Sequence, residues 1–336
     1  MISTAPLRRL LAALAVIPLL VPAAARPALA APAADGRDLT AYANPLMGSV
    51  GPGFPMVGAQ LPFGMIEPGP DTGHPGTSDP VNYDGYAYQD TMIRGFSLAH
   101  FDGAGIPIGG DLPFMPTTGA VTSSDPLQYQ SAYTHTAETA EPGFYSVALA
   151  RYGTSVALSA AERSAIMRYT FPAGGQANVL AHPGLNIKGT HPASVRVRDA
   201  HTLEGWMRSE TRATDGYTLY FSAVFDQAFA ATGTWTGAGG TPSPGTTATG
   251  DGAGAYLTFA PGQVVTMRVG ISYVDLAGAR NNRQSEIPGT RTLENVRQAA
   301  HETWNAHLHG IEVETTGNSA LELERLKAFY SSLYKA

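Results

Sequence analysis

The sequence of 336 residues contains no cysteine and few charged residues. Without cysteine, the chain can form neither disulfides nor thiolate metal sites, so its stability must come from a large hydrophobic core. Charged residues make up 14% of the chain, whereas glycine and proline number 38 and 25. This composition is typical of a β-rich protein with many short strands and turns.

Long apolar runs are lacking after residue 30. Residues 1–30 have the pattern of a secretory signal peptide, with Arg8 and Arg9, an apolar run from Leu10 to Val21, and a small-residue cleavage site at Ala28-Leu29-Ala30. We therefore expect a secreted, extracellular protein with no membrane span, because no other stretch reaches the length a bilayer requires.

Positive charge is also scarce in the expected mature chain. Removing residues 1–30 removes three arginines and no acidic residue, so 21 − 3 = 18 basic residues face 27 acidic ones, a net charge of −9. A nucleic-acid partner would require a clustered basic face. We therefore expect no nucleic-acid binding.

Strand-like runs recur through most of the chain, either alternating or continuously apolar and ending at glycine, proline or asparagine. They lie at 143–152, 155–172, 177–184, 217–226, 255–262 and 263–274. They predict a mainly β fold, a large antiparallel β-sandwich over residues 31–288. The Gly/Ser/Thr/Pro-rich stretch between Trp235 and Gly254 is predicted to be a hairpin tip or a flexible insertion.

Helical patterns replace strand patterns after Pro288. Residues 292–311 have a threonine cap at Thr292 and a glycine stop at Gly310, and a short strand, IEVE, follows. A second helix is predicted over 318–336, with an apolar face formed by Leu323, Leu326, Phe329, Tyr330 and Leu333. Because a helix cannot bury such a face alone, it either packs on the sandwich or begins a helical domain.

Polar residues recur at the bends of a segment rich in glycine and proline, residues 44–119, where binding groups are expected on a rigid scaffold. These residues are Asp71, Asp84, Tyr86, Tyr88, His100, Asp102 and Asp111. Aromatic faces can cover the C–H surface of a sugar, and Asp and His can hydrogen-bond its hydroxyls. Carbohydrate recognition therefore fits these residue types, although core packing of the tyrosines and loop hydrogen bonds of His100 stay open as simpler explanations.

Three other kinds of site fit less well. GAGIPIGG (103–110) lacks the Lys-Ser/Thr of a phosphate-binding loop. Ser97, His100 and Asp102 are too close in sequence for a hydrolase triad, and no nucleophile elbow is present. Asp71, Asp79 and Asp84 could supply hard oxygen ligands to a metal, but calcium-loop spacing is missing, and turn hydrogen bonds explain them more simply.

Several blocks in one order carry a resemblance to a known family. They are NPLMG (44–48), LPFGM (61–65), PDTG (70–73), GYAYQDTMIRGFSLAHFDGAG (85–105) and GDLPFMPTTG (110–119), with later agreement at 135–149, 158–172, 264–289 and 329–334. Together they resemble glycoside hydrolase family 92, the calcium-dependent exo-α-mannosidases. The resemblance covers nearly everything from Asn44 to the end.

The resemblance implies a secreted, inverting exo-α-mannosidase, of α-1,2 type, acting on terminal α-mannosides of glycans. It implies an N-terminal β-sandwich over 31–288, then a helical linker and the start of an (α/α)₆ catalytic domain over 289–336, with the rest of that domain packing on the sandwich. The catalytic carboxylates and most of the calcium environment are expected in that barrel, so no catalytic or metal-binding residue is assigned here. The alternative is a stand-alone carbohydrate-binding module without catalysis.

Substrate contacts are expected from the loops 44–54, 71–90 and 95–111. The residues assigned to them are Leu46, Asp71, Asp84, Tyr86, Tyr88, His100 and Asp102. The chain departs from the family pattern at Leu46, where members commonly have phenylalanine, and around His100, at Ala99 and Phe101-Asp102-Gly103. Inverting hydrolysis needs two carboxyl groups about 6.5–9.5 Å apart. Glu67 and Asp102 are the only pair proposed, and the sequence does not place them opposite one another.

Overall fold

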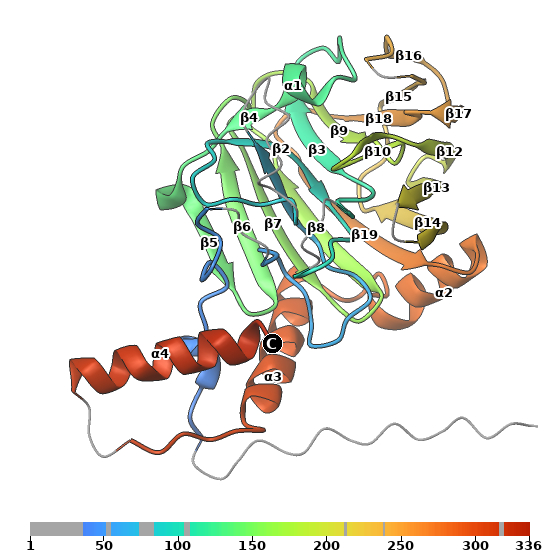
Figure 1. The fold of residues 1–336 in the computed structure, drawn as a ribbon. Helices are drawn as coiled ribbons and strands as arrows, with labels where there is room; N and C mark the ends of the chain where they lie inside the picture. The colour runs from blue at the N-terminus through green and yellow to red at the C-terminus, as the bar shows by residue number, and fades with distance from the viewer. Residues whose placement is uncertain are drawn as a thin grey trace, which may run out of the picture. The chain divides into compact units, whose positions relative to one another are not determined.

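The computed structural model describes residues 36–51, 55–73, 84–103, 108–211, 214–237, 239–315 and 319–336 (Figure 1). The predicted signal peptide lies outside the described residues. The described residues all belong to one compact unit, Ala31–Ala336. In that part of the chain, no helix is long and apolar enough to cross a bilayer.

One antiparallel sheet carries the segments predicted to bind a ligand. Its strands follow the order β1-β2-β3-β9-β18-β15-β16, and β4 pairs with β2. The strands are β1 (Gly69–Gly73), β2 (Met92–Ser97), β3 (Phe114–Thr118), β4 (Ser131–Ala132), β9 (Ala177–Ala181), β15 (Ala231–Trp235), β16 (Ser243–Pro244) and β18 (Gly254–Phe259).

A second, larger antiparallel sheet faces the first, in the order β17-β12-β13-β14-β19-β8-β7-β6-β5 (Figure 1). Its strands are β5 (Glu138–Glu141), β6 (Phe144–Leu149), β7 (Thr154–Ala160), β8 (Ser164–Thr170), β12 (Pro192–Asp199), β13 (Thr202–Thr211), β14 (Thr214–Phe225), β17 (Thr247–Asp251) and β19 (Val264–Ser272). A short hairpin, β10 (Leu185–Asn186) and β11 (Gly189–Thr190), stands apart.

The core fills the space between the sheets because successive strand residues point to opposite faces. On β8, Ala165, Met167 and Tyr169 are fully buried in this core. The intervening Ile166 is equally buried but packs on the opposite side with Leu293 and Val296. These observations confirm the predicted antiparallel β-sandwich.

Two helices cover the outer face of the larger sheet. They are α2 (Leu276–Glu286) and α3 (Leu293–Leu308) (Figure 1). Arg280 of α2 holds the buried carboxylate of Glu204 with two hydrogen bonds, 2.7 and 2.5 Å long. Thr292 caps α3 in a reciprocal capping box with Asn295, as Thr292 was expected to do.

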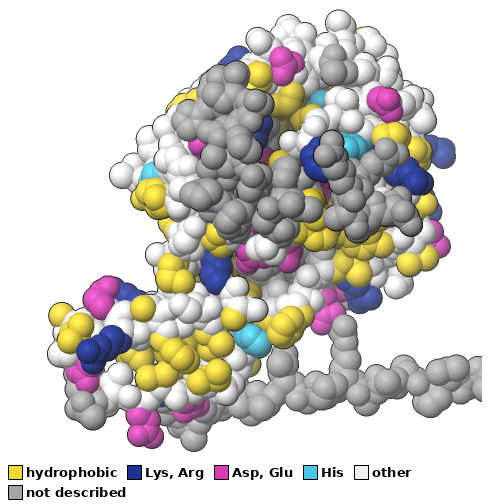
Figure 2. Space-filling model, viewed as in Figure 1, with side chains coloured by type: hydrophobic (Ala, Val, Ile, Leu, Met, Phe, Trp, Pro, Cys, Tyr) yellow, Lys and Arg dark blue, Asp and Glu magenta, His cyan; other side chains and the backbone are white. Residues whose placement is uncertain are grey.

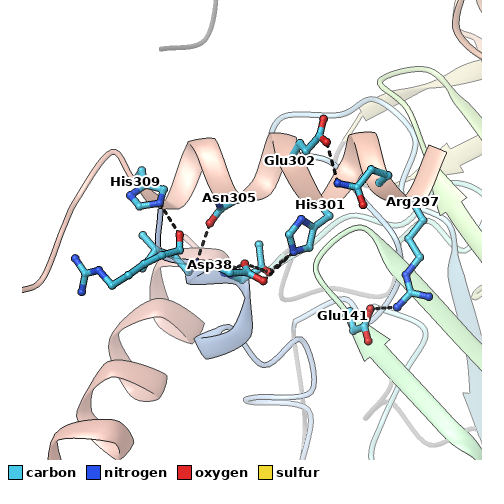
Figure 3. Close-up of polar contacts among 11 residues, drawn as sticks. Asp38, Glu141, Arg297, His301, Glu302, Asn305 and His309 are labelled. Carbon is cyan, nitrogen blue, oxygen red and sulfur yellow. Dashed lines mark hydrogen bonds and ion pairs between the residues drawn. The ribbon is translucent and has the colours of Figure 1, made fainter. Parts of the chain in front are cut away.

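The N-terminal segment is held against α3 (Figure 3). The 3₁₀ helix η1 (Leu39–Tyr42) begins with the Leu39 amide donating to Asn305 Oδ1 over 2.8 Å. His301 Nε2 lies 3.1 Å from Asp38 Oδ2, and His309 Nε2 lies 3.0 Å from the carbonyl oxygen of Arg37. Two short elements complete the description, α1 (Pro126–Tyr129) and the 3₁₀ helix η2 (His135–Ala137).

The last helix, α4 (Ala320–Tyr334), packs its apolar face on η1 and α3 through Leu326, Tyr330 and Tyr334. Of the five residues predicted to form that face, Leu326 and Tyr330 are buried, and Phe329 and Leu333 are partly buried. Leu323 remains 42% exposed. Apolar side chains remain visible over α4 in Figure 2.

Three segments differ from the sequence-based expectation. The stretch between Trp235 and Gly254 is no simple hairpin tip, because β16 pairs with β15 in one sheet and β17 pairs with β12 in the other. The predicted IEVE strand at 311–314 does not form, and the Val313 amide donates instead to the Tyr330 hydroxyl. Helix α2 was not predicted, because its sequence is polar and lacks a regular apolar face.

Candidate functional site

Strands β1 and β2 bring Asp71 beside His100. Asp71 pairs with Gly95 across the two strands, and the register shifts directly after Asp71. The buried Asp71 carboxylate contacts the Ser97 hydroxyl, and its Oδ1 lies 3.0 Å from His100 Nε2. Asp71 therefore lies between Ser97 and His100, and no hydrogen bond joins those two residues in the described chain.

His100 is buried, and both its ring nitrogens face acceptors. Nδ1 lies 2.8 Å from the backbone carbonyl oxygen of Glu67, and Nε2 faces Asp71. Burial opposes the charged imidazolium, but the hydrogen bond and negative charge of Asp71 outweigh it, so the pKa of His100 is raised. His100 thus acts within the scaffold, holding Asp71 and the turn at Glu67 in place.

Gly85 allows this arrangement because it has no side chain. Its φ is +91°, and a Cβ there would lie 2.7 Å from His100 Nε2 and 3.0 Å from Asp71 Oδ1. The backbone of the Asp84-Gly85-Tyr86 turn can therefore approach the His100 ring directly.

Three carboxylates, Glu67, Asp84 and Asp102, form what we call the carboxylate cluster. Burial, then the negative charge of Asp102, raises the pKa of Asp84 to about 7. Burial, then the charges of Asp102 and Asp84, also raises the pKa of Glu67 to about 7, against the opposing charge of His100. The structure thus places Glu67 near Asp102, which the sequence could not do.

The cluster has acceptor atoms without a hydrogen-bond partner of normal geometry among the described residues. Asp84 is 1% exposed, and neither of its carboxylate oxygens has such a partner in the described part of the chain. A backbone hydrogen bond of poorer geometry from Gly103 lowers the pKa of Asp84 but does not offset its burial. Glu67 Oε2 is also buried without a partner. Buried polar atoms without partners are rare in native proteins, and carboxylates with perturbed pKa values often mark functional sites.

Lys335, directly after α4, supplies a positive charge beside the cluster. Its ammonium group donates to the carbonyl oxygen of Met56, whose amide donates to Asp102 Oδ1 over 2.9 Å. Burial lowers the pKa of Lys335 to about 8, against the attraction of Asp102, Asp84 and Glu67. The helical part of the chain therefore contributes a charged group to a site built by the sandwich loops.

The two predicted tyrosines lie in a neighbouring aromatic group. Tyr86 is fully buried, and its hydroxyl donates to Glu138 Oε2 over 3.0 Å. Tyr88 is 36% exposed and stacks on His135, with ring centroids 3.8 Å apart. Tyr86 therefore has a core position, whereas Tyr88 presents part of its ring to solvent.

The remaining predicted residue, Leu46, is partly buried and packs on the main core. The structure thus brings together Asp71 with His100, which are in hydrogen-bond contact, and Asp84 with Asp102, whose charge, second to burial, raises the pKa of Asp84. The charge of His100 also acts on Asp84, so the two pairs are neighbours. Lys335 was not foreseen, because its partners lie hundreds of residues earlier in the chain. The sequence carried no local signal for that contact.

The geometry of the described residues does not support the serine triad, and it offers no evidence for a phosphate-binding loop or a metal site. Asp102 accepts a hydrogen bond from the Met56 amide, and His100 faces Asp71 instead. Ser97, His100 and Asp102 therefore do not form a catalytic triad. Asp79 and residues 104–107 of the glycine-rich stretch lie outside the described residues. Across the described ranges, no group of three His, Asp or Glu side chains is placed to hold a metal ion.

Comparison with known proteins agrees with the fold. Residues 42–272 match the glycosyl hydrolase family 92 N-terminal domain, and residues 278–336 match the family 92 catalytic domain. An uncharacterized secreted glycosidase of Arthroderma benhamiae is 25% identical, with 89% of this chain and 41% of that protein covered.

Solved structures are similar over the same range. A family 92 α-mannosidase of Bacteroides thetaiotaomicron, in complex with mannoimidazole, superposes with a TM-score of 0.79 at 28% identity, covering 89% of this chain and 40% of that one. An inverting family 92 mannosidase from the same organism gives 0.77 at 26% identity, with 89% and 39% covered. The present chain spans about 40% of the length of these relatives. It belongs to glycoside hydrolase family 92.

Proposed function

We propose that this chain forms one wall of the substrate site of a secreted, inverting exo-α-mannosidase of α-1,2 type. The wall consists of the loops 44–54, 71–90 and 95–111. The observation that carries the proposal is the carboxylate cluster, in which buried oxygens of Asp84 and Glu67 lack partners of normal hydrogen-bond geometry among the described residues. Sugar hydroxyls would satisfy those oxygens.

The protonation state of the cluster suits a ligand rich in hydroxyl groups. With pKa values of about 7, Asp84 and Glu67 are each partly protonated near neutral pH. In its protonated form a carboxyl group can donate one hydrogen bond and accept others, as a hydroxyl does, and in its ionised form it only accepts. His100 and Asp71 then act as positioning residues, because they fix the turn that carries Glu67.

Relatives support the choice of substrate. One of the matching structures holds mannoimidazole, and another is described as an inverting mannosidase. The matched fungal relative is described as secreted, in line with the signal-peptide pattern in residues 1–30. We assign no catalytic carboxylate to this chain, and we propose that the acid, the base and the calcium ligands come from the remainder of the catalytic domain.

The test compares the 336-residue chain with the same chain joined to the remainder of a family 92 catalytic domain. We expect α-1,2-mannobiose to be hydrolysed only by the joined protein, with β-mannose as the first product by NMR. Chelation of calcium should abolish that turnover.

Turnover by the 336-residue chain, lost on Asp84→Asn or Glu67→Gln, would instead assign the chemistry to the carboxylate cluster. Saturable mannoside binding by the chain, with no turnover even in the joined protein, would favour a stand-alone carbohydrate-binding module. Preferential hydrolysis of α-1,3- or α-1,6-mannobiose would contradict the assigned linkage.

A further inference from the structure

A pocket lies beside β1 and β2, with a volume of about 220 Å³. It is smaller than the roughly 300–1,000 Å³ of sites for drug-sized ligands, so it suits a small molecule. The described residues that line it include Asp71, Arg94, Pro113, Asn186, Ile187 and Lys188. We call it the Arg94 pocket.

Two cationic side chains line the Arg94 pocket, and neither forms an ion pair with a described residue. Arg94 Nη2 donates to the Thr72 carbonyl oxygen over 2.8 Å, and its Nε is buried without a partner. A Cβ on Gly73 would lie only 3.1 Å from Arg94 Cζ, so this glycine lets the guanidinium lie close against β1. Lys188 is exposed between β10 and β11.

The acceptors in the pocket are already engaged. Asp71 contacts Ser97 and His100 with its two oxygens. Asn186 Oδ1 accepts from the Lys188 amide and lies 2.8 Å from His191 Nε2, and Asn186 Nδ2 donates to Asp111 over 3.0 Å. The hydrogen-bonding capacity left for a ligand is therefore mainly that of the two cations.

The β10–β11 hairpin makes the pocket a built feature of the fold. Asn186 ties the hairpin to Asp111 at the base of the loop that precedes β3. Gly110, with φ of +67°, accommodates Ile187, since a Cβ there would lie 2.5 Å from Ile187 Cγ1. Ile187 and Pro113 then offer an apolar surface next to the two charges.

We propose that the Arg94 pocket binds a small oxyanion, a carboxylate or phosphate group carried on a compact body such as a sugar ring. Arg94 and Lys188 hold the charge, and Ile187 and Pro113 contact the body. Guanidinium groups form paired hydrogen bonds to both kinds of oxyanion. This site adjoins the proposed mannoside wall, with which it shares Asp71 and Gly110, but its ligand differs, because a neutral mannoside does not require two cations.

The test is calorimetric titration of the 336-residue chain with glucuronate, inorganic phosphate and neutral glucose at low salt. We expect saturable binding of at least one anion and none of glucose. Tighter binding of glucuronate would identify a sugar acid as the ligand, and binding of phosphate alone would identify a phosphate group. Lys188→Gln and Arg94→Lys should each weaken that binding by about tenfold, the order of one charged hydrogen bond.

Lys327→Gln, on the exposed side of α4, is the matched control and should bind like the unaltered chain. Lys188 is exposed, so its variant stays informative even if Arg94→Lys fails to fold. Absence of anion binding, or unchanged binding in Lys188→Gln and a folded Arg94→Lys, would overturn the proposal. Mannoside binding should be unchanged in Lys188→Gln, so this proposal and the mannosidase proposal can fail separately.

Discussion

At the scale of single residues, position 85 has little room for a side chain. Gly85→Ala would place a Cβ 2.7 Å from His100 Nε2 in a backbone with φ of +91°. We expect it to lower the free energy of unfolding by about 2–4 kcal/mol, measured by urea denaturation, because backbone strain and a steric clash add. Gly103→Ala is the control, with φ of +67° and open space around its Cβ. Equal losses in the two variants would show that the His100 contact is unimportant.

The second prediction concerns Asp84 and the pH dependence of stability. Its folded pKa of about 7 lies above its ordinary value of 3.8, so the folded chain binds more protons than the unfolded chain between these pH values. Stability therefore falls as pH rises from about 4 to about 7. Asp84→Asn should weaken this slope and raise the free energy of unfolding at pH 8 by about 1–3 kcal/mol.

Asp251→Asn, at an exposed position, is the control for Asp84→Asn and should leave the pH dependence of stability unchanged. Urea denaturation at pH 4, 6 and 8 measures both variants. If Asp84→Asn destabilised the chain at pH 8, the carboxylate would have a stabilising partner, contrary to the geometry.

Residue types in the site were more predictable than their contacts. The acidic residues and His100 stood out because they occur at bends rich in glycine. The sequence could not show that Asp71 lies between Ser97 and His100, because that placement depends on the pairing of β1 with β2 and its register shift. Nor could it show that Tyr86 is buried, since a tyrosine in such a loop suits either the core or a ligand.

At the scale of elements, α4 offers a matched pair of leucines. Leu326 is 7% exposed and packs with η1 and α3, whereas Leu323 is 42% exposed. Leu326→Ala should lower the free energy of unfolding by about 2–4 kcal/mol and Leu323→Ala by less than about 1 kcal/mol, because only the first leaves a cavity. Urea denaturation followed by circular dichroism measures both. Similar losses would mean that α4 does not dock as described.

Elements with strong local patterns were predictable, and those that depend on distant partners were not. Thr292 and the periodic residues after it predicted α3. Alternating or continuously apolar runs predicted β6, β7, β8, β14 and β19 of the larger sheet, but only β9 and β18 of the other. The strands β16 and β17 have a loop-like composition and form because the edges of two sheets flank them. The IEVE segment has strand-like residues but pairs with no described sheet edge.

At the scale of the whole molecule, Lys335 links the last helix to the first loops. Its folded pKa of about 8 lies below its ordinary value of 10.5, so Lys335 loses its proton at a lower pH in the folded chain than in the unfolded chain. Stability should therefore rise as pH increases from about 8 to about 10.5, and Lys335→Gln should remove this rise. Melting temperatures across that range measure the effect, with Lys327→Gln as the control. An unchanged rise in Lys335→Gln would place the ammonium outside the cluster.

The central claim is that the carboxylate cluster forms part of a mannoside site, and calorimetric titration with methyl α-mannoside tests it most directly. The 336-residue chain and Asp251→Asn should bind the sugar with equal affinity. Asp84→Asn should bind the sugar with an affinity lower by about tenfold or more, the order of one hydrogen bond to a charged group. This loss is expected even though Asp84→Asn should be the more stable protein at pH 8. Absence of binding to the unaltered chain, or equal binding by Asp84→Asn, would contradict the claim.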